Sequence, residues 1–143
     1  MRRLSGADGN ALVEFTYLSV LLFIPLLYVL LTVFQVQRAA FAVTEAARQA
    51  GRAYATADNP GSGTARATLA SDLALRAQGL PSGGAPAVGC STTCLAPGST
   101  VTVTVSYTVT LPVLGFLLPG DLSPTIPVSA THTEVVDTFR AVG

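Results

Sequence analysis

The chain has 143 residues, of which 50% are hydrophobic and 11% are charged, and its eight basic and eight acidic residues give a formal net charge of zero. Because the basic residues are few and scattered, this composition excludes a polyanion-binding surface and argues against a nucleic-acid partner. The length allows one small domain beside a membrane helix, and the large apolar share excludes a disordered chain.

The first feature along the chain is a long apolar segment. It begins near Gly9, and no charged residue lies between Phe15 and Gln37. Roughly 22 helical residues that rise about 1.5 Å each span about 33 Å, enough for a bilayer core of about 30 Å. We therefore expect one membrane-spanning helix, kinked at Pro25 because proline lacks a backbone donor.

A cleaved secretory signal is the alternative interpretation of this segment. Arg2 and Arg3 form a short positive region, and Ala40-Phe41-Ala42 resembles a small-residue cleavage site. The apolar core of a signal has only about 7 to 15 residues, however, and this run is longer. The two arginines favour a cytoplasmic N-terminus, and a pair of cysteines downstream favours a C-terminal part outside the cytoplasm.

The most unusual residue of the segment is Glu14, an acid at the start of the apolar run. A carboxylate that enters lipid without a partner costs a few kcal/mol on insertion scales. Glu14 is therefore either a solvated flanking charge or a group that meets a fixed positive charge.

The residues around Glu14 resemble a known family. Gly9, four further residues, the Glu14-Phe15 pair and a long apolar helix are similar to the processing signal of type IV pilins. Two sequence motifs resemble those of TadE-like minor pilins or pseudopilins of the Tad (Flp, type IVb) system. They are Gly-Asn-Ala-Leu-Val-Glu-Phe at 9–15 and Ala-Ala-Arg-Gln-Ala-Gly-Arg at 46–52.

The resemblance implies a precursor whose residues 1–9 are a leader that a prepilin peptidase removes after Gly9. Asn10 would become the new N-terminus, Phe15 would belong to the recognition motif, and Glu14 would pair with a terminal amine during assembly. Residues 10–57 would form the transmembrane and stalk helix, and 58–143 a head outside the cytoplasm. Other pilins, the assembly machinery, the peptidase and membrane lipid are the partners that this implies.

Two helices are predicted from the composition and spacing of the residues. The segment 35–57 is rich in Ala, Gln and Arg, which are good helix formers, and a Gly/Pro/Ser linker at 58–63 should end it. We expect a Glu45–Arg48 pair on its surface. A second helix is expected at 64–78, with an Asp72–Arg76 pair on one face. Its core-facing apolar stripe is predicted to consist of Leu69, Leu73, Ala77 and Leu80.

Cys90 and Cys94 are the only cysteines, separated by three residues. Two cysteines are too few ligands for a metal, and His132 is the only histidine, so no metal site or cofactor is expected. Thioredoxin-type chemistry needs two intervening residues rather than three. We therefore expect a disulfide that pins a turn and adds little stability, because its loop is very short.

The strands are predicted from alternation. Apolar and Thr/Ser residues alternate strictly from Thr100 to Leu111, which indicates a strand with one buried and one wet face. A second strand is expected at 126–139, where Pro127 indicates a sheet edge or a strand start, with a bulge at Val135 and Val136. The two strands can pair antiparallel, and a short third strand is expected within 84–96.

The connection at 112–119 is short and apolar. It is too short to span a membrane. It either folds back on the protein's own core, touches the membrane surface or contacts a partner.

We find no catalytic motif. Ser129, His132, Glu134 and Asp137 allow an acid–base set to be imagined, but on a strand His132 and Glu134 are ordinary polar neighbours of a solvated face. The sequence thus predicts an α+β fold and a structural rather than enzymatic protein of the cytoplasmic (inner) membrane that enters or assists a pilus. The alternatives are an uncleaved single-pass assembly factor and a membrane-anchored binding or secretion module.

Overall fold

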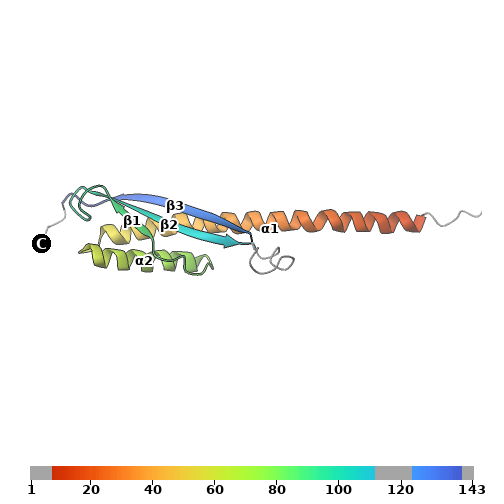
Figure 1. Cartoon of the computed structure of the whole chain (residues 1–143), viewed down its shortest axis with the longest axis horizontal. Coiled ribbons are helices and arrows are strands. Elements are labelled where there is room, and N and C mark those ends of the chain that lie inside the picture. The colour runs from red at the N-terminus through yellow and green to blue at the C-terminus, as the bar shows by residue number, and fades with distance from the viewer. Residues whose placement is uncertain (1–7, 112–123, 140–143) are drawn as a thin grey trace, which may run out of the picture. The chain divides into compact units, whose positions relative to one another are not determined.

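The computed structural model describes residues 8–111 and 124–139, with the side chains of residues 8–10 excepted. It has an α+β layout, as predicted, with two helices followed by a three-stranded antiparallel sheet. The elements are α1 (Asp8–Ala55), α2 (Pro60–Ala77), β1 (Ala87–Cys90), β2 (Thr100–Thr110) and β3 (Thr125–Val135). Figure 1 shows them in chain order.

Helix α1 is continuous from Asp8 to Ala55, and Pro25 lies inside it without interrupting it. The predicted kink at Pro25 stays a prediction. The chain divides into two compact units with the boundary between Phe34 and Gln35. The first part of α1 therefore belongs to one unit, and the part from Gln35 to Ala55 belongs to the unit that contains the remaining elements.

Helix α2 begins four residues earlier than predicted. Asn59 caps it by accepting a hydrogen bond from the Ser62 amide at 2.9 Å, and Ser62 Oγ accepts one from the Asn59 amide at 3.3 Å. Pro60 follows the cap at a position where its missing N–H is no loss. The prediction that 60–63 is linker was wrong, because this reciprocal capping outweighs the low helix propensity of the two glycines.

The end of α2 was predicted correctly. Gly79 has a positive φ of 69°, which suits glycine because it has no Cβ. Its amide donates to the Arg76 carbonyl at 2.9 Å, and the Leu80 amide donates to the Leu75 carbonyl at 3.0 Å. This reversal stops the helix and returns Leu80 to the core.

In the sheet, β2 lies between β1 and β3, so the predicted edge position of the Pro127 strand is confirmed. The register of β2 and β3 runs without interruption from Thr100 opposite Val135 to Thr110 opposite Thr125. The predicted bulge at Val135 and Val136 was therefore wrong: Val135 is on the exposed face, and Val136 continues the alternation as a fully buried residue. The strand ends at Val135 rather than at 139. The predicted third strand is β1.

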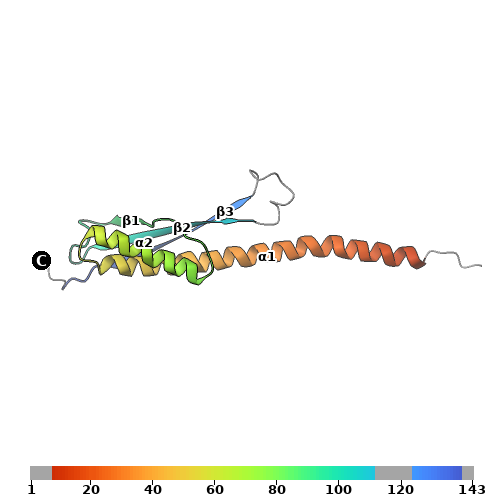
Figure 2. The ribbon, with the colours of Figure 1, turned by 90° about the horizontal axis from the view of Figure 1, so that it is seen from below.

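The core of the unit from Gln35 lies between the sheet and a pair of helices, the second part of α1 and α2. Figures 1 and 2 show these two helices side by side and antiparallel, with the sheet as a second layer over them. The valines of β2 at 101, 103 and 105 are almost completely buried, and Leu75 is the largest fully buried side chain. Alanines supply most of the helical part of this core: Ala39, Ala42, Ala46, Ala47, Ala50 and Ala67.

The predicted apolar stripe of α2 was wrong for three of its four members. Leu69 and Leu73 are 65% and 68% exposed, and Ala77 is exposed as well, whereas Leu80 is buried as predicted. The face of α2 that is buried consists of Gly63, Ala67, Ser71 and Leu75. Small residues are needed there because α2 lies close to an alanine-rich helix.

Both predicted surface pairs are replaced by other contacts. Gln49 Nε2 donates to Glu45 Oε1 at 2.7 Å, and Ser82 Oγ donates to Asp72 Oδ1 at 2.6 Å. Within residues 8–111 and 124–139, neither Glu45–Arg48 nor Asp72–Arg76 is an ion pair. The apolar connection at 112–119 lies outside the described residues.

Candidate functional site

The first unit presents an exposed apolar helix. Every large apolar side chain from Leu12 to Phe34 except the half-buried Tyr28 is exposed, with exposed fractions between 44% and 72%. Within the described residues, α1 is one helix long and apolar enough to cross a membrane, with a mean hydropathy of 2.4 in its most apolar window. An apolar surface of this extent needs a covering of lipid or of other protein.

The polar groups in this apolar segment include two threonines whose hydroxyls are satisfied by the helix itself. Thr16 Oγ1 donates to the Leu12 carbonyl at 2.8 Å, and Thr32 Oγ1 donates to the Tyr28 carbonyl at 2.9 Å. A hydroxyl that already has a partner costs less in hydrocarbon than a free one. The segment is thus compatible with a single membrane span.

The predicted processing residues all lie at the start of α1. Gly9 and Asn10 are in its first turn, and Glu14 and Phe15 follow one turn later. Glu14 is exposed, and its carboxylate makes no hydrogen bond or ion pair within the described part of the chain. The peptide bond between Gly9 and Asn10 lies where helical amides lack partners within the helix, so opening the backbone there costs little.

The spacing of Asn10 and Glu14 is the most informative feature of this site. Residues four apart on a helix lie on the same face about one turn apart. A free amine at Asn10, if one were formed, would therefore lie on the same face as the Glu14 carboxylate.

Cys90 and Cys94 form the expected disulfide, with a Cα–Cα distance of 5.4 Å. The bond closes the turn at the end of β1, and Cys94 packs against the core. The Ser91 amide donates to the Thr100 carbonyl at 3.0 Å, which extends the β1–β2 pairing by one step. Within the described residues, no group of three or more His, Cys, Asp or Glu side chains is placed to hold a metal ion.

The imagined acid–base set does not come together. His132 Nε2 lies 3.0 Å from Glu134 Oε2, so these two are neighbours on one face, as expected. Ser129 lies on the opposite, exposed face of β3, opposite Ser106. The Asp137 carboxylate accepts a hydrogen bond from the Phe139 amide at 2.9 Å. No nucleophile is therefore aligned with His132.

The expected solvated face for His132 and Glu134 is only partly solvated. Both side chains are only 31% and 32% exposed, and a Cβ placed on Gly51 of α1 would lie 3.2 Å from His132 Cδ2. The sequence pattern missed this contact because His132 is on the same face as Val128 and Ala130, which pack on the core. The alternation of β3 placed His132 on the core-facing side, but we assigned it to a solvated face because its side chain is polar.

No protein-family model, no curated protein and no solved structure matches this chain.

Proposed function

We propose that the chain is a TadE-like minor pilin or pseudopilin of a Tad-type pilus. It is made as a single-pass precursor in the cytoplasmic membrane, and prepilin peptidase removes residues 1–9. The processed chain then enters the fibre or primes its assembly. The observation that carries the proposal is the position of Glu14, an acid one turn after Gly9-Asn10 on a helix whose following apolar segment is almost wholly exposed.

The apolar segment supports this function because its residues suit both the membrane and the interior of a fibre. Lipid covers such a surface in the precursor, and the equivalent helices of neighbouring subunits can cover it in a fibre. Glu14 favours the transfer of the chain from the membrane into the fibre. A carboxylate in hydrocarbon costs a few kcal/mol unless it meets a positive charge, and a new N-terminal amine on a neighbouring subunit supplies that charge.

The head supports the proposal by its construction. Gln35–Ala55 is an integral part of the head's core, so the head and the apolar segment share one helix. The disulfide at Cys90–Cys94 agrees with a head outside the cytoplasm.

Assembly of Glu14 variants in the bacterium that produces the pilus tests this function. The amount of the protein in sheared surface fibres, or the number of fibres if it acts as a primer, is compared with its amount in the membrane. We expect Glu14→Gln to reach the membrane at the normal level and to reduce fibre incorporation or fibre number at least tenfold, since a charge-assisted pair contributes about 1.5 to 3 kcal/mol.

Glu45→Gln is the matched control, because it removes an exposed carboxylate from the same helix outside the apolar segment. It should leave both quantities unchanged. Normal assembly of Glu14→Gln would exclude the role of Glu14. A chain that supports assembly with residues 1–9 still attached would instead favour an uncleaved assembly factor.

A further inference from the structure

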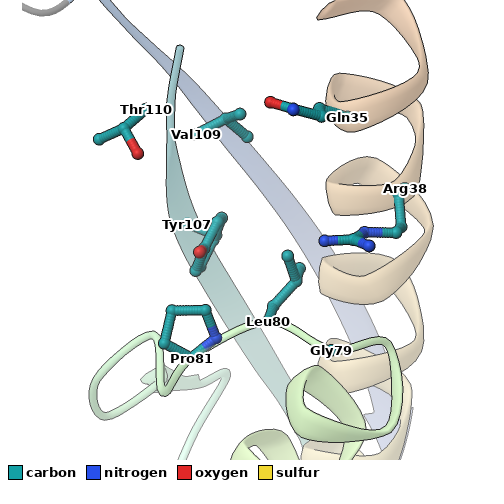
Figure 3. Close-up of a pocket in the computed structure, with 8 residues that line it drawn as sticks. All are labelled: Gln35, Arg38, Gly79, Leu80, Pro81, Tyr107, Val109 and Thr110. Carbon is teal, nitrogen blue, oxygen red and sulfur yellow. The ribbon is translucent and has the colours of Figure 1, made fainter. Parts of the chain in front are cut away.

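The unit from Gln35 onward contains a small cleft that the proposed function does not use. It lies between α1 and β2 and has a volume of about 250 Å³. The residues that concern its chemistry are Gln35, Arg38, Leu80, Tyr107, Val109 and Thr110. Figure 3 shows Gln35 and Arg38 extending from α1 toward the strand that carries Tyr107, Val109 and Thr110.

The cleft carries one uncompensated positive charge. Among the described residues that line the cleft, Arg38 is the charged one, and none is Asp or Glu. Within residues 8–111 and 124–139, the Arg38 guanidinium makes no ion pair, and the side chains of Gln35, Tyr107 and Thr110 make no hydrogen bond. A cation, the amide of Gln35 and the hydroxyl of Tyr107 therefore lie at one cleft without being satisfied by one another, whereas the Thr110 side chain is exposed and points away from α1 (Figure 3).

This set of groups suits a phosphate diester. A guanidinium binds phosphate oxygens through two parallel N–H donors, and hydroxyl and amide groups can hold the ester and glycerol oxygens. Leu80 and Val109 add an apolar wall to the same cleft. A ligand with a charged phosphate beside an apolar chain would use both parts of the site.

The position of Arg38 in the sequence identifies the source of such a ligand. After Phe34 the segment becomes polar, with Val36 as its one apolar residue before Arg38, and Arg38 is the first charged residue after Glu14. Four helical residues rise about 6 Å, and the headgroup layer on each side of a bilayer core is roughly 5 to 7 Å thick. Arg and Tyr are also residues that favour this layer. In a membrane-spanning chain, Arg38 therefore lies at the depth of the lipid phosphates.

We propose that this cleft binds the phosphodiester headgroup of an anionic phospholipid, with Arg38 on the phosphate and Tyr107 on the glycerol part. The inference rests on the membrane span of the proposed function. The bound lipid holds the head against the outer face of the membrane, so it must be released before a subunit leaves the bilayer.

Native mass spectrometry of the full chain, released from detergent micelles that contain phosphatidylglycerol, tests the site. We expect one lipid to be retained per chain, and Arg38→Gln to weaken its retention about tenfold or more. Tyr107→Phe, which removes only a hydroxyl, should weaken it severalfold. Arg48→Gln is the control, because Arg48 is an exposed arginine of the same helix outside the cleft, and it should have no effect.

The competing explanation is that Arg38 is an ordinary flanking charge. In that case Arg38→Lys would retain the lipid as well as the native chain does, and Tyr107→Phe would change nothing; this result overturns the proposal. If soluble glycerophosphoglycerol competes as effectively as the lipid does, the proposal is also overturned, because the site would then bind a free phosphodiester and not a lipid.

A separate arm distinguishes this inference from the proposed function. The full chain is reconstituted into phosphatidylcholine–phosphatidylglycerol vesicles and extracted with alkaline carbonate. A chain that resists extraction while Arg38→Gln retains lipid normally overturns only the lipid site. A native chain that is extracted has no membrane span, which overturns both. Far-ultraviolet circular dichroism confirms that each variant is folded.

Discussion

Gly63 of α2 lies directly against the ring of Tyr54 of α1. A Cβ on Gly63 would lie 3.0 Å from Tyr54 Cδ2 and Cε2, tighter than nine in ten real Cβ contacts. The Tyr54 ring is 3% exposed, so it has little room to move away. The close approach of Gly63 to Tyr54 therefore favours glycine at this position.

Gly63→Ala should lower the free energy of unfolding of the head by about 1 to 2 kcal/mol, since overpacking outweighs the gain in helix propensity. Urea denaturation of the full chain in detergent, followed by circular dichroism, measures the change. Gly61→Ala is the control. A Cβ there would lie 3.4 Å from Asn59 Oδ1, an ordinary contact, so this variant should be neutral or up to about 1 kcal/mol more stable. Equal effects of the two substitutions would contradict the close approach.

The buried face of α2 makes a second prediction. Leu75 is fully buried, whereas Leu73, two residues earlier, is 68% exposed. Leu75→Ala should cost about 2 to 5 kcal/mol of unfolding free energy, because it leaves a cavity in the core. Leu73→Ala should stay within about 0.5 kcal/mol. The same denaturation experiment compares them, and a larger effect at Leu73 would restore the stripe of Leu69 and Leu73 as the core face.

The disulfide makes a third prediction. The loop between Cys90 and Cys94 is so short that the chain-entropy term amounts to about 2 kcal/mol at most. The double variant Cys90→Ser, Cys94→Ser should therefore fold, with an unfolding free energy lower by about 2 kcal/mol or less. Thermal unfolding of the native chain with and without a reductant gives an independent value. Loss of folding in the double variant would show that the turn depends on the bond far more than its length implies.

The parts of the fold that the sequence predicted are those with strong local signals. The Val/Thr alternation of 100–111 predicted β2, and the Gly79–Pro81 stop predicted the end of α2. Both signals follow from local backbone preferences and from the burial of one face of a strand. The pairing of β2 with β3 was also predicted, because a single apolar connection links two strands of similar length.

The parts that the sequence did not predict depend on a partner helix. The leucines of α2 were assigned to the core by their spacing, but Leu69 and Leu73 are exposed, and α2 approaches α1 closely at Gly63, where Tyr54 leaves little room for a side chain. Small residues, including Gly63 and Ser71, lie on the buried face of α2 instead. Hydrophobicity alone does not show this, because the deciding quantity is the distance between two helices.

The candidate site divides in a similar way. Glu14 and Phe15 were identifiable because an acid at the start of an uncharged run is unusual in any sequence. The cleft around Arg38 was not, since Tyr107 reaches it from a strand far along the chain. Arg38 by itself had only the appearance of a flanking charge.

The central claim is that the chain is cut between Gly9 and Asn10. Mass spectrometry of the protein isolated from its own membrane or fibres, with sequencing of its N-terminal peptide, measures this directly. We expect a mature chain that starts at Asn10 and a precursor that accumulates when the prepilin peptidase is absent. An intact Met1, or a start near Phe41 or Val43, would contradict it.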